Sequence, residues 1–232
     1  MDELRRLDLL IHLEVLKQKS SRPDNPLEQF KGLVLTDEEI AGLLTETAGP
    51  QSGNSPAAPG EAELQQVNEE LNRLTSQIRT RREASLKEGV YLSLPHLSEL
   101  FNLTPFEEQC ILITLAPELD RRYEKLYAYL QDDVTRKRPG VDLVLKLLCP
   151  SMQEKLAARP VFAPQAPLLK FGLVEMTGRA PEDFTPLLSR FIKLNDRIVN
   201  FLLISDELPP QLEHAARVVR PGQGPVRDIT PD

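Results

Sequence analysis

Residues 91–149 read YLSLPHLSELFNLTPFEEQCILITLAPELDRRYEKLYAYLQDDVTRKRPGVDLVLKLLC and predict three helices in succession. Thr104 suits the N-cap of the first helix, and Pro105 suits its first turn. Glu107 stands three residues after the cap, where its carboxylate reaches back to the amide of Thr104. The segment 110–115 is apolar on nearly all sides, so we expect this helix to be the buried core helix.

The second and third helices each have an apolar side that predicts packing onto the first. Asp120 caps the second helix, whose apolar stripe is Tyr123, Leu126, Tyr127 and Leu130. The third helix spans 141–148, and its inward side is Val141, Val144, Leu145, Leu147 and Leu148. Asp142 and Lys146 are its polar residues, four positions apart. Three helices in this order are a helix-turn-helix candidate.

Two strand patterns follow these helices and predict a hairpin. Residues 168–176 and 187–194 have strand-like patterns, and the loop between them holds Gly178, Pro181 and Pro186. Asn195 then caps a final core helix. A hairpin after three helices is the wing of a winged-helix domain. The predicted fold class is mainly α with a small β-hairpin, a winged-helix-like domain preceded by long helical arms.

The first arm is an apolar helix over residues 2–17, too hydrophobic to remain alone in water. Docking on its own domain and docking on a partner or second copy are both consistent with this pattern. A capping box at Thr36 opens a short helix, and residues 46–60 have the Pro, Gly and Ser content of a linker.

The second arm is a long helix over residues 61–87. Its apolar residues recur at intervals of three and four, which is the seam of a short coiled coil: Leu64, Val67, Leu71, Leu74 and Ile78. This seam packs either along its own domain or against another chain. The predicted organisation is an arm and linker at 1–60, a long helix at 61–90, a winged-helix-like domain at 91–205 and a C-terminal linker or tail at 206–232.

Composition and charge restrict the classes of function. The net charge of −7 argues against general attraction to nucleic acid or to anionic membranes. There is no apolar run of membrane-spanning length and no signal-peptide pattern, so we expect a cytoplasmic protein. Cys110 and Cys149 stand in apolar helical surroundings, which indicates buried thiols rather than a disulfide.

Catalytic and metal-binding patterns are not found in the sequence. None of the 11 glycines is followed by lysine, so there is no phosphate-binding loop. The histidines and cysteines have no metal-ligand spacing, and no nucleophile has a plausible base. We therefore expect a chain that is not an enzyme and holds no cofactor or metal.

The predicted interaction surface is the polar turn before the third helix. Its residues are Asp132, Asp133, Arg136, Lys137 and Arg138. They either bind a protein partner or only fix the turn. DNA binding by this basic cluster is the alternative function, although the third helix has almost no polar residues with which to read bases. An oligomerisation scaffold built on the coiled-coil seam is a further alternative.

Several stretches of the chain resemble a known family: bacterial AAA-type ATPases with an N-terminal winged-helix-like domain, including those encoded with contractile, phage-tail-like injection systems. The matching stretches are NPLEQFKGL from Asn25, TDEEI from Thr36, YLSL from Tyr91, LTPFE from Leu103, LAPELDRRYEKLYAYLQDDVTRKRP from Leu115 and APLL from Ala166. The block from Leu115 to Pro139 is the most specific of them.

The resemblance implies that an ATPase module with a phosphate loop follows this region. The chain ends at Asp232 without one, so we expect it to be an N-terminal portion or a free-standing relative. The intact protein would be a hexameric, ATP-driven remodeller. This part would be a recognition or adaptor domain that binds a protein client or assembly component.

Overall fold

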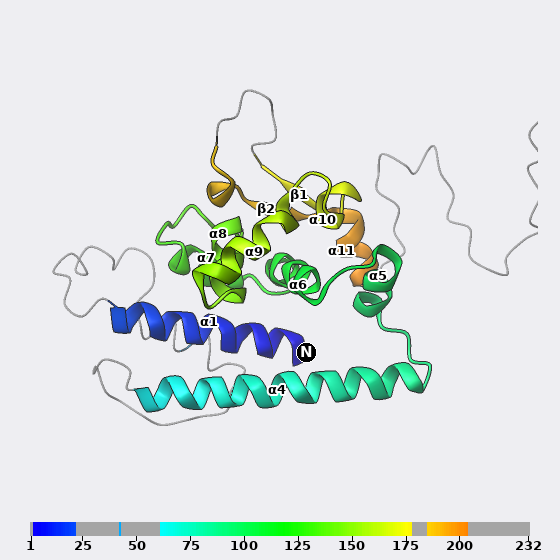
Figure 1. Ribbon diagram of the computed structural model, residues 1–232, viewed down its shortest axis with the longest axis horizontal. Helices are drawn as coiled ribbons and strands as arrows, with labels where there is room; N and C mark the ends of the chain where they lie inside the picture. The colour runs from blue at the N-terminus through cyan, green and yellow to red at the C-terminus, as the bar shows by residue number, and fades with distance from the viewer. Residues whose placement is uncertain (1, 22–41, 43–60, 178–184, 204–232) are drawn as a thin grey trace, which may run out of the picture.

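The computed structural model describes residues 2–21, 42, 61–177 and 185–203, and it is mainly helical with one pair of short strands (Figure 1). The elements in chain order are α1 (Asp2–Ser21), α4 (Glu61–Lys87), α5 (Ser93–Phe101), α6 (Pro105–Leu119), α7 (Arg122–Leu130), α8 (Val141–Leu148), α9 (Met152–Ala158), the 3-10 helix η1 (Arg159–Phe162), α10 (Pro167–Lys170), β1 (Val174–Met176), the 3-10 helix η2 (Leu187–Ser189), β2 (Ile192–Leu194) and α11 (Asp196–Leu202). The predicted fold class is confirmed. The short helix at Thr36, the linker at 46–60, the loop around Gly178 and Pro181, and the tail at 206–232 lie outside the described residues.

The central element is α6, as the sequence predicts. The Thr104 side chain accepts a hydrogen bond from the Glu107 amide, and the Thr104 amide donates to the Glu107 carboxylate at 2.8 Å. Residues from Cys110 to Ala116 are all buried, so α6 has no wet face over that length. The hydroxyl of Tyr127 on α7 donates to the carbonyl of Ile113 at 2.8 Å, which joins α6 to α7 inside the core.

The two long helices form layers below the winged-helix core. Figure 1 shows α1 lying between α4 and the layer of α6, α7 and α8. Leu7, Ile11 and Val15 of α1 are buried in the same core as α6 to α8. On its other side α1 packs against the seam of α4, where Val67 joins a second, smaller cluster. The apolar side of α1 and the seam of α4 therefore both pack within this chain.

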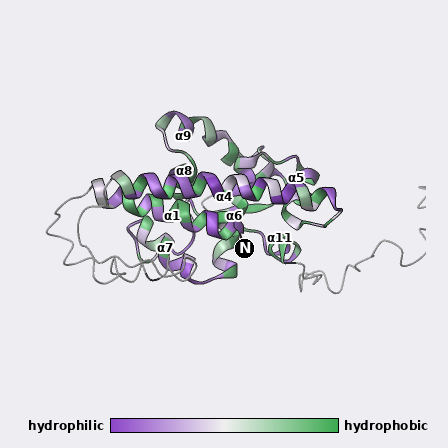
Figure 2. Cartoon of the chain, turned by 90° about the horizontal axis from the view of Figure 1, so that it is seen from below, coloured by the Kyte–Doolittle hydropathy of each residue, from purple (hydrophilic) through white to green (hydrophobic). Residues whose placement is uncertain are grey.

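The outward side of α4 is polar. Figure 2 views the molecule from the α4 side and shows α4 crossing in front of α1 and α6. Asn68, Asn72, Ser76 and Arg79 are all exposed there. The coiled-coil pattern thus marks an intramolecular contact with α1. The opposite side of α4 is exposed to solvent.

The predicted strands are real but were predicted too long. β1 and β2 pair antiparallel, with Val174 opposite Leu194 and Met176 opposite Ile192. Residues 167–170 form α10 instead of strand, because Pro167 starts a helical turn and Gly172, with φ of +64°, ends it. Residues 187–189 form η2 after Pro186.

Both cysteines are free and buried, which confirms that prediction. Burial raises the pKa of the Cys110 thiol well above its ordinary value and also raises the pKa of the Cys149 thiol. No helix in the described part of the chain is long and apolar enough to cross a membrane.

Candidate functional site

The third helix of the predicted helix-turn-helix, α8, faces inward. Val144 is fully buried and Leu147 is 7 % exposed, while Asp142 is the exposed residue of the helix. The Lys146 ammonium lies 3.4 Å from the Glu14 carboxylate of α1. The helix α1 packs against α8, and its Glu14 pairs with Lys146. The helix α8 therefore has no basic or amide-bearing face with which to read DNA bases.

The polar turn before α8 is organised by Gln131, a residue the sequence analysis did not single out. Its side-chain nitrogen donates to the carbonyls of Arg136 and Arg138, each at 3.0 Å. Its side-chain oxygen accepts from the Gly140 amide at 3.0 Å. A Cβ at position 140 would lie 2.9 Å from that oxygen, so glycine permits the close approach. No local spacing in the sequence signals this role.

Two of the five predicted surface residues hold the turn together. The Asp133 carboxylate accepts from the amide and hydroxyl of Thr135 at 2.9 and 2.6 Å, and these hydrogen bonds lower its pKa. The Arg136 Nε lies 3.3 Å from Asp133, and its guanidinium lies 5.3 Å from the centre of the Phe191 ring. Asp133 and Arg136 therefore make contacts that fix the turn, which is one of the two roles that the sequence analysis gave this cluster.

The other three predicted residues are exposed. Asp132 has a positive φ of 54°, and Lys137 and Arg138 extend from the outer part of the turn. The turn runs beside the wing, because the Val141 amide donates to the carbonyl of Arg190 at 3.0 Å. All five residues thus stand in the turn between α7 and α8, and the start of α8 is joined to the wing through the backbone of Arg190.

This surface carries charges of both signs. The positive residues of the turn are Arg136, Lys137 and Arg138, and its negative residues are Asp132 and Asp133. A surface of mixed charge suits a protein partner that offers complementary pairs, whereas a phosphate backbone favours an unbroken basic stripe.

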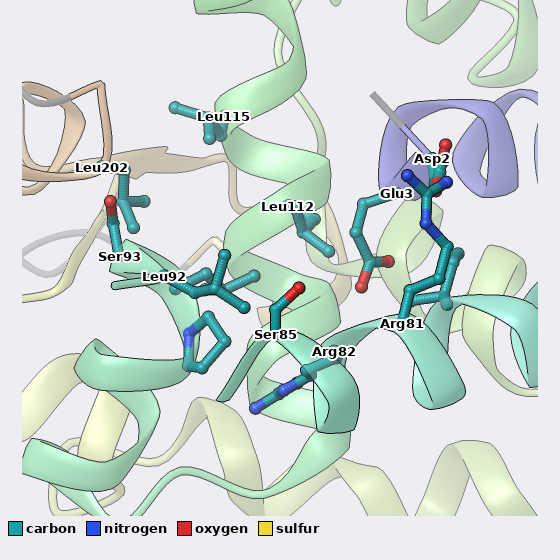
Figure 3. A pocket seen from close by; sticks show the side chains of 13 residues that line it. Asp2, Glu3, Arg81, Arg82, Ser85, Leu92, Ser93, Leu112, Leu115 and Leu202 are labelled. Atoms are coloured by element: carbon teal, nitrogen blue, oxygen red, sulfur yellow. The ribbon is translucent and has the colours of Figure 1, made fainter. Parts of the chain in front are cut away.

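A hollow lies away from this turn, and the sequence analysis did not predict it. Figure 3 shows this hollow between the start of α1, the end of α4, and residues of α5, α6 and α11. It has a volume of about 520 Å³. Its apolar lining residues are Ile78, Leu92, Leu94, Pro95, Leu112, Leu115 and Leu202. Residues from five separate elements meet here, so no single stretch of sequence predicts it.

Arg82, which lines this hollow, forms an ion pair with Glu108 beside it. Arg82 donates to both carboxylate oxygens of Glu108, at 2.6 and 2.8 Å. Burial alone raises the pKa of Glu108, but the hydrogen bonds and charge of Arg82, together with Ser98 and the charge of Arg6, outweigh it, and the net pKa is lowered. The same hydrogen bonds raise the pKa of Arg82. Arg81 pairs with Asp2 at the more exposed rim.

The contacts around Arg6 complete this charged cluster. The Arg6 guanidinium lies 2.8 Å from Glu3, and burial lowers its pKa despite the nearby carboxylates. Each acid here has a basic neighbour, so the arrangement fixes helices in place and offers no obvious proton donor or acceptor. In the described ranges, no group of three or more His, Cys, Asp and Glu is placed to hold a metal ion.

A family model described as winged helix domain, variant, matches residues 1–216. No curated protein and no solved structure matches the chain. The matched range includes both long helices as well as the three-helix core and the hairpin. With its helices, its wing and nearly its whole length inside that match, the chain belongs to the variant winged helix domain family.

Proposed function

We propose that this winged helix domain is a non-catalytic recognition or adaptor domain that binds a protein client or assembly component. The observation that supports it is the buried position of α8 under α1, with Lys146 paired to Glu14. The helix that reads DNA in many winged-helix proteins is here part of the core. The polar surface that remains, around Lys137 and Arg138, has charges of both signs.

The partner module in this proposal is an AAA-type ATPase, which the resemblance of residues 115–139 to such proteins supports. The ATPase would follow in the same chain or act as a separate subunit. The intact assembly would be a cytoplasmic bacterial hexamer, of the kind encoded with contractile injection systems. This domain would select the client, and the motor would act on it.

Two measurements test the coupling to a motor. Purified residues 1–232 should not hydrolyse ATP above the rate of a blank. The gene should continue beyond codon 232 into a Gly-Lys-Thr or Gly-Lys-Ser phosphate loop, or the neighbouring genes should encode a motor that binds this chain. ATP turnover by residues 1–232, or the lack of any motor in either place, would overturn the proposal.

DNA binding is the second candidate function, and the basic residues before α8 are the observation that favours it. Lys137 and Arg138 are both exposed in the turn before α8. If they contact phosphates, the affinity for duplex DNA should fall steeply with salt, and each lost contact should reduce the salt slope by roughly one.

The two functions are separated by measuring fluorescence anisotropy of labelled duplex DNA at several salt concentrations. The variant is Lys137→Ala with Arg138→Ala, and the control is Arg73→Ala with Arg79→Ala on the exposed side of α4. The adaptor proposal expects weak binding that changes equally little in both variants. A loss of about tenfold confined to the loop variant would support DNA binding instead.

A further inference from the structure

A second hollow lies beside Arg82, where α4 is connected to α5, and we call it the α5 hollow. It has a volume of about 600 Å³ and shares Arg82, Leu92 and Pro95 with the hollow of Figure 3. Its other lining residues come from the end of α4, from α5 and the segments on either side of it, and from the start of α6. A hollow of this size accommodates a large side chain or a small ligand, so the chemistry of its walls decides what it binds.

The lining of the α5 hollow has an excess of negative charge. It contains two carboxylates, Glu99 and Glu108, and one guanidinium, Arg82. Arg82 donates to both oxygens of Glu108, at 2.6 and 2.8 Å, so these two charges balance each other. Glu99 is exposed and has no ion pair among the residues that the structure describes. Its carboxylate is therefore left to attract a cation.

Two helices also end at the α5 hollow. Gly89 follows α4 and Asn102 is the C-cap of α5, and both line the hollow with a positive φ, of 74° and 50°. The last carbonyls of a helix lack amide partners within it and carry a partial negative charge. The helix α6 begins beside them, but Glu107 and Glu108 in its first turn offset the positive charge of that end. The helix ends therefore favour a cation as well.

An aromatic pair on the wall of the hollow suits a flat cation. The ring centres of Tyr91 and His96 lie 5.3 Å apart, and Tyr91 is 57 % exposed. His96 and Glu99 are three residues apart on α5, so they are neighbours on one face of this helix. A guanidinium group stacks on an aromatic ring and also pairs with a carboxylate through its planar N–H groups. An arginine side chain therefore fits these walls better than the compact ammonium group of lysine.

Exposed apolar residues at the same hollow indicate that the cation belongs to a larger molecule. Leu86 is 49 % exposed and Val90 is 47 % exposed, and both line the hollow. A free cation would leave them in water, whereas a peptide with apolar residues on both sides of an arginine would cover them. We propose that the α5 hollow binds an arginine side chain of a protein partner. The guanidinium lies between Tyr91 and Glu99, and the apolar neighbours of the arginine pack on Leu86 and Val90.

This inference rests on the proposed adaptor function, because it gives that function a surface and a partner of stated chemistry. The two can still fail separately. Loss of DNA affinity confined to the Lys137→Ala, Arg138→Ala chain would contradict the adaptor function. A peptide titration that changes only residues of the α5 hollow decides whether this hollow takes an arginine.

A double-mutant cycle between peptide and protein tests the proposal in the full chain. The probe is the peptide acetyl-ALARALA-amide, and its control peptide has citrulline, an uncharged isostere, in place of arginine. The protein variant is Glu99→Gln. Its matched control is Glu118→Gln, which removes another exposed carboxylate near the far end of α6. NMR titration of the isotope-labelled chain measures the affinity and the place of binding, and circular dichroism shows that each variant is folded.

The arginine peptide should shift the amide signals of Gly89, Glu99 and Asn102. It should bind the native chain about fivefold more tightly than the citrulline peptide does. This preference should remain in Glu118→Gln and fall below about twofold in Glu99→Gln. Tyr91→Leu, which keeps an apolar side chain, should reduce the affinity for the arginine peptide by about threefold.

Several results would overturn the proposal. They are an equal affinity of the native chain for the two peptides, shifts confined to other elements, or no binding at about 2 mM peptide. Acetyl-arginine-amide that binds as tightly as the peptide would show that the hollow takes a small cation instead of a protein segment. A dimer in light scattering that Glu99→Gln dissociates would show that a second copy of the chain fills it.

Discussion

At the scale of single residues, a buried ionic group holds α1 to α7. The Arg122 guanidinium donates to Asp8 at 2.8 Å, and the Tyr123 hydroxyl donates to the same carboxylate at 2.8 Å. Burial and the Asp8 charge both raise the pKa of Tyr123. Asp8 and Arg122 are each less than a tenth exposed, so their attraction is only weakly screened by water.

Asp8→Asn should reduce the free energy of unfolding by about 3 kcal/mol, because it leaves a buried guanidinium without its main counter-charge. Urea denaturation followed by circular dichroism measures this. The control, Asp2→Asn, removes an exposed ion pair with Arg81 and should cost less than about 1 kcal/mol. Equal effects of the two substitutions would contradict a special role for Asp8.

The Arg82–Glu108 pair predicts a dependence of stability on pH. The folded pKa of Glu108 lies below its ordinary value of 4.5, so the charged carboxylate stabilises the fold above that pH. This contribution is lost as pH falls below 4.5 and through the lowered pKa. The difference in melting temperature between the native chain and Glu108→Gln should be full near about pH 6 and shrink towards about pH 3. A constant difference would contradict it.

Residue pairs differ in how far the sequence predicts them. Thr104 and Glu107 form their capping box three residues apart, so local spacing is sufficient to predict it. Asp8 and Arg122 are 114 positions apart, and Gln131 bonds to backbone atoms, which carry no side-chain signal. Contacts of these two kinds depend on the completed fold, and the sequence alone did not predict them.

At the scale of elements, hydrophobic periodicity predicted the helices better than the strands. The inward side of α8 and the seam of α4 both pack as their patterns indicate. The strands are three residues each: Pro167 and Gly172 impose a helical turn before β1, and residues 187–189 form η2 before β2. The hollow beside Arg82 was missed because its lining residues come from five elements that are far apart in the sequence.

The contact between α4 and α1 gives a test of the scaffold interpretation. Leu74 is 7 % exposed, and Leu74→Ala should reduce the free energy of unfolding by about 2–3 kcal/mol by leaving a cavity. The exposed Gln77→Ala should have almost no effect. Light scattering over a range of concentrations should give the same mass for the native chain and for both variants. A mass that falls with dilution and falls further in Leu74→Ala would show pairing between chains.

At the scale of the whole molecule, the described part is a stack in which α1 is shared by two layers. One side of α1 enters the main core through Ile11, and the other meets α4 through Leu13 and Leu16 (Figure 1). The family match from residue 1 agrees with this, because it treats the long helices and the winged helix as one domain sequence.

Because α1 packs both in the main core and against α4, we expect these two layers to unfold together. Ile11 is fully buried, and Ile11→Ala should cost about 3 kcal/mol. The loss should appear equally in circular dichroism and in the tyrosine fluorescence, to which the buried Tyr123 and Tyr127 contribute, with coincident transitions. The exposed Arg5→Ala should shift neither signal by a measurable amount. A dichroism change without a tyrosine change would mean that α1 unfolds as a separate arm.

The place of α1 in this stack also affects how the protein is made. During synthesis α1 leaves the ribosome before the helices that cover it, and the arginine that neutralises Asp8 is added 114 residues later. Until then the apolar side of α1 has no core to pack against, because α6 to α8 are not yet complete. We therefore expect a bulky domain fused directly before α1 to hinder the packing of this helix between its two layers.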